Sequence, residues 1–115
     1  MKVKLNILER IAIMNYLQTS GTYRLLSTVQ KTGKMLLITE EERKKVEMEI
    51  TPQGTRWNKK YEEEREFDLP RQAYDLIKKR VEELDKQGTL TLEMVSVYEK
   101  FVGKPDEEVD PVITG

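Results

Sequence analysis

The spacing of the apolar residues constrains the fold of this 115-residue chain more than any other feature of its sequence. Over most of the chain these residues recur every three to four positions, which is the repeat of an amphipathic helix. Between positions 46 and 51 the repeat changes to alternation with polar residues, as in a strand with one buried face. A chain of this length forms about one domain. The sequence therefore predicts an α+β fold: a mainly helical single domain of four to five helices with a small antiparallel β-hairpin.

The first predicted helix is apolar over most of its circumference. It runs from Leu5 to Gln18, and only Asn6, Glu9 and Arg10 form a narrow polar stripe along it. A helix with so little polar surface is expected at the centre of its domain. The second predicted helix ends at Gly33, where a glycine suits a left-handed cap. Its predicted apolar face consists of Tyr23, Leu25, Leu26 and Val29.

Capping signals mark the other helices. Thr39 and Glu42 have the spacing of a capping box at the start of a short third helix. The fourth helix is predicted from Pro70, which suits a first turn, to Gly88. The last helix is predicted from a Thr91 cap to Gly103. The apolar faces of these two helices are predicted to be Ala73, Tyr74, Ile77, Val81 and Leu84, and Met94, Val95, Tyr98, Phe101 and Val102.

The predicted β segment lies between the third and fourth helices. Pro52–Gly54 is typical of a turn, which joins the strand at 46–51 to a partner strand at Thr55–Asn58. Glu66–Leu69 alternates again and predicts a third short strand. Three helices followed by a hairpin is the order of elements in a winged helix. A winged-helix-like arrangement is therefore one option for this fold.

Composition along the chain separates a domain from a tail. Residues 1–103 are the predicted globular domain, whereas residues 104–115 contain two prolines and four acidic residues without an apolar repeat. This composition predicts a disordered acidic tail. No window approaches the roughly 18 consecutive apolar residues of a membrane span. Polar residues interrupt the N-terminal apolar stretch, so we expect no signal peptide, no membrane contact and a cytoplasmic location.

Missing residue types limit the catalytic chemistry. The chain has no histidine and no cysteine, so the commonest general base, a common nucleophile and the usual zinc ligands are absent. Nearly all of its acidic residues have the spacing of a solvated helix face or lie in the run 62–64. Its glycine turns match no phosphate-binding motif, and no loop has the pattern of a metal site. We therefore expect no enzymatic activity, no cofactor and no metal.

Charge argues against a nucleic-acid partner. Twenty basic residues are balanced by twenty-one acidic ones, for a net charge of −1. Dedicated nucleic-acid-binding domains usually have a basic excess. In a winged helix the third helix would face the DNA, but here its first turn is Glu40–Glu42, which would repel phosphates. A winged-helix-type DNA-binding transcriptional regulator remains the alternative function.

The single tryptophan indicates a candidate binding surface. Trp57 lies beside Arg56, Asn58 and Tyr61, and Trp, Tyr and Arg are the residue types most enriched at binding hot spots. Trp57 either closes the core against the helices or belongs to a partner-facing patch. These four residues are the predicted partner-binding site of a non-enzymatic protein-binding accessory or regulatory factor, and homodimerisation is also compatible with the sequence. The other aromatic residues expected in the core are Tyr23, Tyr74, Tyr98 and Phe101.

Several short stretches carry a resemblance to a known group of proteins. They are Leu8-Glu9-Arg10, Trp57-Asn58, Leu84-Asp85, Leu90-Thr91 and Tyr98-Glu99-Lys100-Phe101. In these stretches the chain resembles small uncharacterised proteins encoded in phage and prophage genomes. The resemblance implies a genomic setting and no activity. Small accessory phage proteins commonly act by binding a host or phage protein, which is the partner that the resemblance implies.

Overall fold

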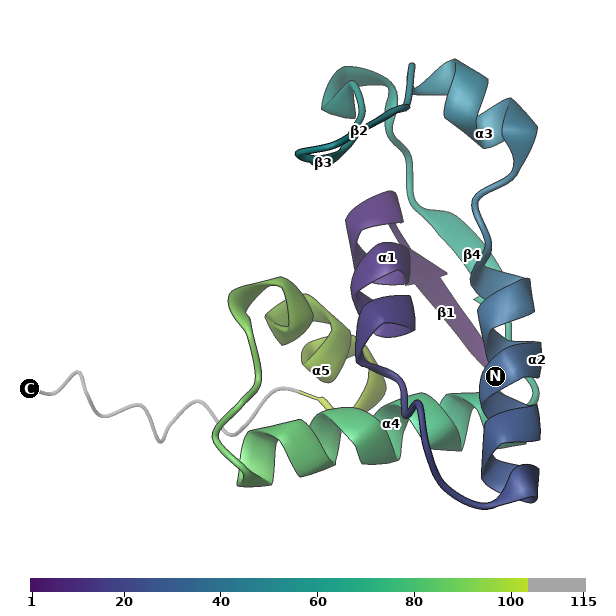
Figure 1. The fold of residues 1–115 in the computed structure, drawn as a ribbon, viewed down its shortest axis with the longest axis vertical. Helices are drawn as coiled ribbons and strands as arrows, with labels where there is room; N and C mark the ends of the chain where they lie inside the picture. Colours follow the sequence, from purple (N-terminus) through teal and green to yellow (C-terminus); the bar gives the residue numbers. More distant parts are fainter. Residues whose placement is uncertain (104–115) are drawn as a thin grey trace, which may run out of the picture.

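Five helices and two separate two-stranded sheets make up residues 1–103, the part of the chain that the computed structural model describes (Figure 1). The helices are α1 (Ile7–Tyr16), α2 (Tyr23–Leu36), α3 (Glu40–Lys45), α4 (Arg71–Lys86) and α5 (Val95–Phe101). The strands are β1 (Lys2–Leu5), β2 (Glu49–Thr51), β3 (Gly54–Arg56) and β4 (Arg65–Asp68), and two 3₁₀ turns are η1 (Lys59–Tyr61) and η2 (Leu92–Met94). The predicted α+β class, mainly helical with a small antiparallel hairpin, is confirmed. The predicted tail, 104–115, lies outside the described residues.

The chain begins with a strand rather than with the predicted helix at Leu5. β1 pairs with β4 in antiparallel register, and Val3 lies opposite Phe67. Val3 and Leu5 alternate with lysines and point into the core, so the two-residue repeat of a strand applies here. Its pairing partner is more than sixty positions away in the sequence, and no local pattern marks that pairing.

α1 occupies the centre of the domain, as predicted. Figure 1 shows α1 between α2 and α5, with α4 running across the three. The core beneath them includes the fully buried side chains of Leu5, Ile13, Leu36, Leu69, Ile77, Val81, Met94 and Val97. None of the helices in residues 1–103 combines the length and apolar character that crossing a bilayer requires.

The polar stripe predicted on α1 is wrong. Asn6 caps the helix instead: its side chain accepts a hydrogen bond from the Glu9 backbone N–H at 2.8 Å, and the Glu9 carboxylate accepts one from the Asn6 N–H at 2.9 Å. Glu9 is 2% exposed and Arg10 is 1% exposed. Both are buried because other elements supply partners of opposite charge, as described below.

The predicted end of the second helix at Gly33 is also wrong, because α2 continues for another turn to Leu36. A glycine inside a helix destabilises it by about 1 kcal/mol relative to alanine. Burying Leu36 completely stabilises the extra turn by roughly 1.5–3 kcal/mol, which is the larger effect. At the start of the same helix Tyr23, expected in the core, is 87% exposed.

The remaining helix ends follow the capping signals with one exception. The Thr39–Glu42 capping box is present on α3. α4 begins directly after Pro70, and Gly88 with φ +71° follows its end, as predicted. Thr91 is not the cap of the last helix: its hydroxyl is buried without a hydrogen-bond partner in the described structure, and α5 starts only at Val95 after the turn η2. Val95 itself is 40% exposed rather than core.

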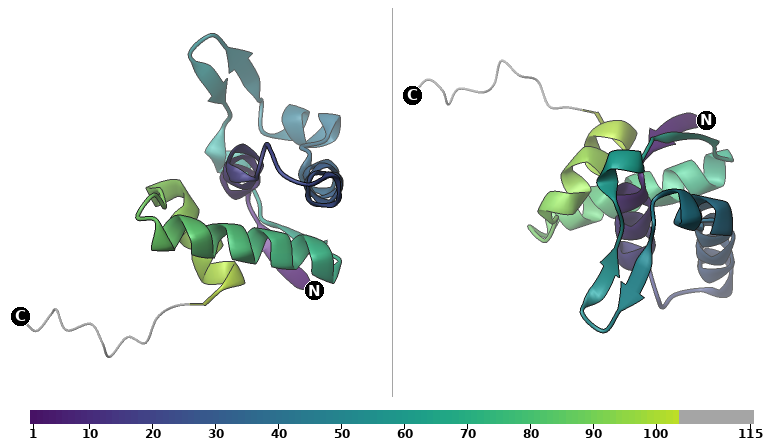
Figure 2. Two further views of the ribbon diagram at one scale, coloured as in Figure 1. Left: turned by 60° about the horizontal axis from the view of Figure 1, so that its bottom comes forward. Right: turned by 90° about the horizontal axis from the view of Figure 1, so that it is seen from above.

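The hairpin forms, but it lies outside the core. Figure 2 shows β2 and β3 projecting from the helices. The strands pair only over Glu49–Thr51 and Gly54–Arg56, because α3 and its cap extend to Val46. The predicted burial of one strand face fails at Ile50, which is 70% exposed. The predicted third strand exists as β4, but it pairs with β1 and not with the hairpin.

Candidate functional site

Two buried ion pairs extend from the first turn of α1, and the first belongs to Arg10. Its guanidinium donates to both carboxylate oxygens of Glu42, at 2.7 and 3.1 Å, and its Nε donates to the Leu36 carbonyl at 3.1 Å. It also lies 5.0 Å from the ring centre of Phe67 on β4. The bidentate pair and the carbonyl bonds join α1, the end of α2, and α3.

Glu42 is held in its charged form by these contacts. Partial burial works to raise the pKa of the Glu42 carboxyl, but hydrogen bonds from Arg10 and Thr39 outweigh it and lower the pKa from 4.5 to about 2. Arg65 adds a more distant contact at 3.4 Å. The polar atoms of this pair therefore help to hold α3 in place, and the Glu42 side chain keeps 24% of its surface exposed.

The second buried pair joins Glu9 to Lys100 on α5, with an O–N distance of 2.8 Å. Lys100 also donates to the Lys4 carbonyl at 2.7 Å and to Glu64 at 2.6 Å. Burial works to raise the pKa of Glu9, but the hydrogen bonds from Lys100 and the Asn6 backbone lower it below its usual range. Burial works to lower the pKa of Lys100, and the two carboxylates raise it. These charges link β1, α1 and α5. Within residues 1–103 no three carboxylates are arranged to hold a metal ion.

Two of the four predicted site residues, Trp57 and Asn58, are held by hydrogen bonds at the base of the hairpin. The Trp57 indole N–H donates to Glu62 at 2.8 Å, and the other oxygen of that carboxylate accepts from the Ile7 N–H at 2.7 Å. The Asn58 amide donates to Glu47 at 3.1 Å, and its oxygen accepts from the Lys60 N–H at 3.0 Å. Trp57 is half-buried and lies outside the main core cluster. It is therefore anchored to the start of α1 while one side remains open to solvent.

The other side chains of this region are more exposed. Tyr61, on η1, is 44% exposed, and Ile50 is 70% exposed. Arg56 lies 3.4 Å from Glu49 across the hairpin, and both of these side chains are mostly exposed. Because side chains alternate along a strand, Ile50 lies on the opposite face of the hairpin from this ion pair. We call Ile50, Arg56, Trp57, Asn58 and Tyr61 together the hairpin surface, which includes both faces of the hairpin and its base.

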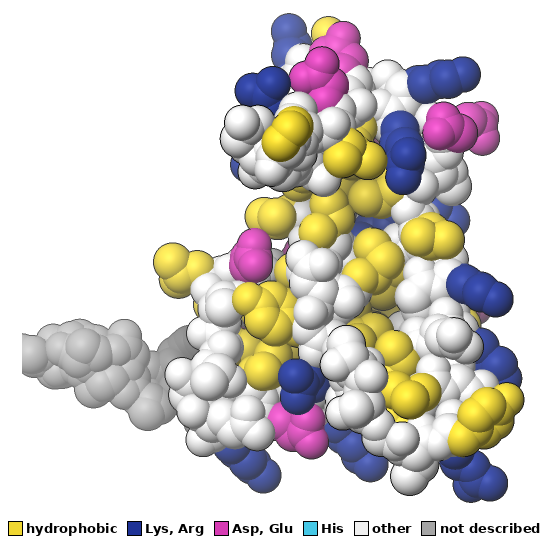
Figure 3. All heavy atoms as spheres, viewed as in Figure 1, with side chains coloured by type: hydrophobic (Ala, Val, Ile, Leu, Met, Phe, Trp, Pro, Cys, Tyr) yellow, Lys and Arg dark blue, Asp and Glu magenta, His cyan; other side chains and the backbone are white. Residues whose placement is uncertain are grey.

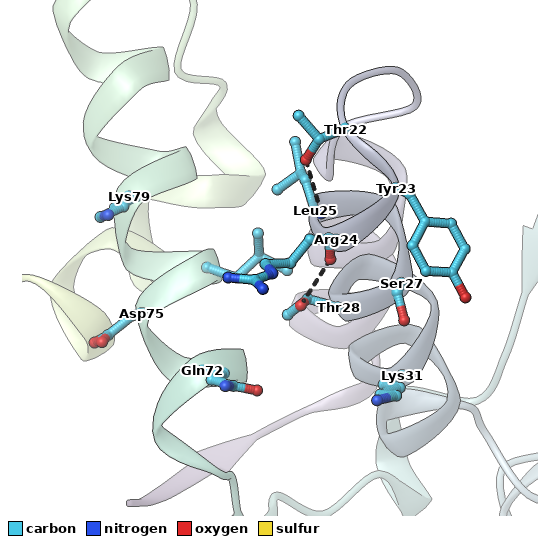
Figure 4. Close-up of a pocket in the computed structure, with 11 residues that line it drawn as sticks. Thr22, Tyr23, Arg24, Leu25, Ser27, Thr28, Lys31, Gln72, Asp75 and Lys79 are labelled. Carbon is cyan, nitrogen blue, oxygen red and sulfur yellow. Dashed lines mark hydrogen bonds between the residues drawn. The ribbon is translucent and has the colours of Figure 1, made fainter.

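A second candidate site is a groove of about 960 Å³ between α2 and α4 (Figure 4). Its apolar floor includes Leu25 and Leu76, and the exposed Tyr23 lies at its edge. Three cations line it, and Figure 4 shows the Arg24 side chain extending from α2 toward α4. The other two cations are Lys31 on α2 and Lys79 on α4. We call this feature the α2–α4 groove.

Sequence reasoning did not identify the α2–α4 groove, because its two walls are some fifty positions apart. One signal was present: α2 contains three basic residues and no acidic one, which is unusual in a chain of balanced charge. Comparison of the chain with protein-family models, curated proteins and solved structures finds no match. Its function is therefore inferred from these two surfaces.

Proposed function

We propose that this protein is a non-enzymatic accessory factor that binds a protein partner through the hairpin surface. The observation that carries the proposal is Ile50, a large aliphatic side chain 70% exposed on a hairpin that stands away from the core. Burying such a side chain against a partner contributes roughly 1.5–3 kcal/mol to the free energy of binding. A projecting apolar side chain of this kind is suited to a pocket on a partner.

Rigidity at the base of the hairpin supports the proposal. The hydrogen bonds of Trp57 and Asn58 hold the loop after β3 against α1 and α3 before any partner binds. The Asn58 backbone N–H also donates to the Val46 carbonyl at 2.7 Å. A surface ordered in advance loses less conformational entropy on association, so more of the contact energy appears as affinity.

The kind of partner follows from the sequence resemblance. The resemblance of short sequence stretches to small phage and prophage proteins, for which the comparisons give no match, is the support for a host or phage protein as the partner, in the cytoplasm, where the sequence predicts this chain to act. A second copy of the chain is the other protein partner that such a surface would suit. Balanced charge around the hairpin, where Arg56 faces Glu49 and Lys45 faces Glu63, favours a protein over a polyanion.

The alternative, a DNA-binding regulator of winged-helix type, stays a prediction. The first turn of α3 carries the exposed Glu40 and Glu41, which would repel phosphates. No specific feature of the hairpin favours DNA over protein. A gel shift with duplex DNA, compared between wild type and Arg56→Glu, tests this alternative directly.

A site-specific photo-crosslink tests the proposed function. A photoreactive amino acid replaces Ile50 in one protein and Leu92 in another, because Leu92 is 92% exposed and lies on η2, away from the hairpin. In cells of the native source we expect a discrete crosslinked protein from position 50 and none from position 92. Equal labelling of the same proteins from both positions contradicts the proposal, and a crosslinked pair of this chain identifies a homodimer.

Affinity measurements with the identified partner complete the test. Ile50→Asp is expected to weaken binding about tenfold or more, and Trp57→Ala by a similar factor. Leu92→Asp is the matched control and should leave the affinity unchanged. Circular dichroism and melting of each variant show that it is folded. Binding that is indifferent to Ile50→Asp would exclude the hairpin surface as the site.

A further inference from the structure

We propose that the α2–α4 groove binds an acidic peptide segment that also carries aliphatic side chains, supplied by a protein partner. The groove and the hairpin surface lie on different parts of the molecule (Figure 1). This proposal therefore does not depend on the hairpin surface, and either site can fail without the other.

The cations of the groove are available for a ligand. The chain has seven arginines, all within the described residues, and six of them lie within 4 Å of a carboxylate. The exception within residues 1–103 is Arg24, which extends over the groove. Lys31 and Lys79 likewise form no ion pair in the described part of the chain, and the carboxylate that lines the groove, Asp75, lies 3.6 Å from Arg71.

Positive charge recurs along α2, which carries Lys34 in addition to Arg24 and Lys31. Figure 3 shows Lys and Arg side chains along the edge of the molecule formed by α2. Because α2 contains no acidic residue, its charge is not cancelled locally, although the whole chain is balanced at −1. A local positive field of this kind attracts anionic groups.

The floor of the groove selects the kind of anion. The apolar residues that line the groove are Leu25 and Leu76, together with the exposed Tyr23. Aliphatic side chains of a peptide would cover this floor while its carboxylates meet the cations at the rim. A phosphate backbone would leave the floor uncovered, and three cations are few for nucleic acid, whose binding depends on many phosphate contacts. These observations favour an acidic peptide over a nucleic acid.

One glycine shapes the end of the groove. Gly21, at φ +150°, precedes the Thr22 cap of α2, and a Cβ built on it would lie 2.7 Å from a methyl carbon of Leu25. A side chain here would have to displace the Leu25 methyl group, and the positive φ of Gly21 also favours glycine. Leu25 lines the groove directly beside this turn.

Binding of a defined probe to the full chain tests the proposal. The probe is a short fluorescein-labelled peptide of alternating Glu and Leu, followed by fluorescence anisotropy. We expect saturable binding that weakens as ionic strength rises. The double variant Arg24→Glu/Lys79→Glu should weaken binding about tenfold or more, because two attractions become repulsions. The matched control is Lys59→Glu, an exposed lysine on η1, which should leave the affinity unchanged.

Changes in the probe test the charge contacts and the apolar contacts separately, without altering the protein. Replacing Leu by Ser in the peptide should weaken binding about fivefold or more, because the floor is then left uncovered. A labelled oligothymidylate should bind more weakly than the Glu–Leu peptide. Oligothymidylate that binds as tightly, or a Ser peptide that binds as well as the Leu peptide, overturns the proposal in favour of a general anion surface. The proposal is also overturned if neither the wild-type chain nor the amide variant described in the next paragraph binds the probe.

A competing occupant is contained in the chain itself. Residues 104–115 include Asp106, Glu107, Glu108 and Asp110 together with aliphatic residues. A full-length variant in which these four are replaced by the corresponding amides should bind the probe as the wild type does. Binding that appears only in this variant would make the chain's own segment the occupant and would overturn the assignment to a partner.

Discussion

Arg10 and Arg24 lie on successive helices and have opposite roles. Arg10 is 1% exposed and donates to a carboxylate and to backbone carbonyls of the same chain. Arg24 is exposed at the rim of the α2–α4 groove and forms no ion pair within the described residues. A buried charge whose hydrogen bonds are all made within the chain stabilises the fold, whereas an exposed charge over an apolar floor is available to a ligand. Residue type alone does not distinguish the two cases.

The largest expected effect is the loss of stability when the buried Arg10 is replaced. Arg10→Met removes the bidentate partner of Glu42 and leaves the Leu36 and Leu37 carbonyls without this donor, so that only Arg65 and the Thr39 N–H still contact the carboxylate. Breaking a buried pair in this way destabilises a protein by about 3–5 kcal/mol. Urea unfolding of the two proteins measures the difference, and Arg10→Lys should recover only part of it because lysine cannot bind both oxygens. A loss below about 1 kcal/mol would mean that Arg10 is not a structural residue.

Acid unfolding should test the Arg10–Glu42 ion pair through the protonation of Glu42. Its pKa of about 2 lies below the ordinary value of 4.5, so its contribution to stability is present above about pH 4.5 and is lost as the pH falls toward 2. A pKa difference of this size corresponds to about 3 kcal/mol. Glu42→Gln should therefore have a shallower loss of stability over this pH range, measured by urea midpoints at each pH. Some acid sensitivity should remain, since the pKa of Glu9 is also lowered. Parallel pH profiles of the two proteins would contradict this assignment.

Lys100 provides a smaller and independent test. Lys100→Met leaves Glu9, which is 2% exposed, without its charged partner, and we expect a loss of about 2 kcal/mol. Adding Glu9→Gln to Lys100→Met should recover part of that loss, because no buried charge then remains. Thermal or urea unfolding of the four proteins gives the coupling between the two residues. Losses that simply add would show that the pair does not interact.

The smallest expected effect on stability comes from replacing the exposed Arg24. Arg24→Ala should change the free energy of unfolding by less than about 0.5 kcal/mol, as at other surface positions. The same variant should weaken binding of the acidic probe to the α2–α4 groove. A large loss of stability would show that Arg24 serves the fold, as Arg10 does, and would remove the contrast between them.

Local signals in the sequence located many of the helix ends. The Thr39–Glu42 box, Pro70 and Gly88 each act on the backbone within a few residues, so the structure follows them. Gly33 shows where a local signal is overruled, since the burial of Leu36 extends α2 past it. Ile50 shows the opposite case, in which an alternating pattern predicts burial but no helix covers the hairpin.

The candidate sites were only partly visible in the sequence. Arg56, Trp57, Asn58 and Tyr61 could be proposed because they are neighbours along the chain and of the residue types found at interfaces. The α2–α4 groove could not, because Arg24 and Lys79 line the same groove only through the packing of two helices. Whether the hairpin surface binds a partner stays a prediction for the experiments above.

Backbone preferences and the repeat of apolar residues determined the fold class, the number of helices and the position of the hairpin, because these effects act over one or two turns. The tertiary structure alone decided that β1 pairs with β4, that Glu9 and Arg10 are buried and that Arg24 is not. The reason is that burial of a charge depends on a partner from a distant segment, and Lys100 and Glu42 reach α1 only after the chain has folded.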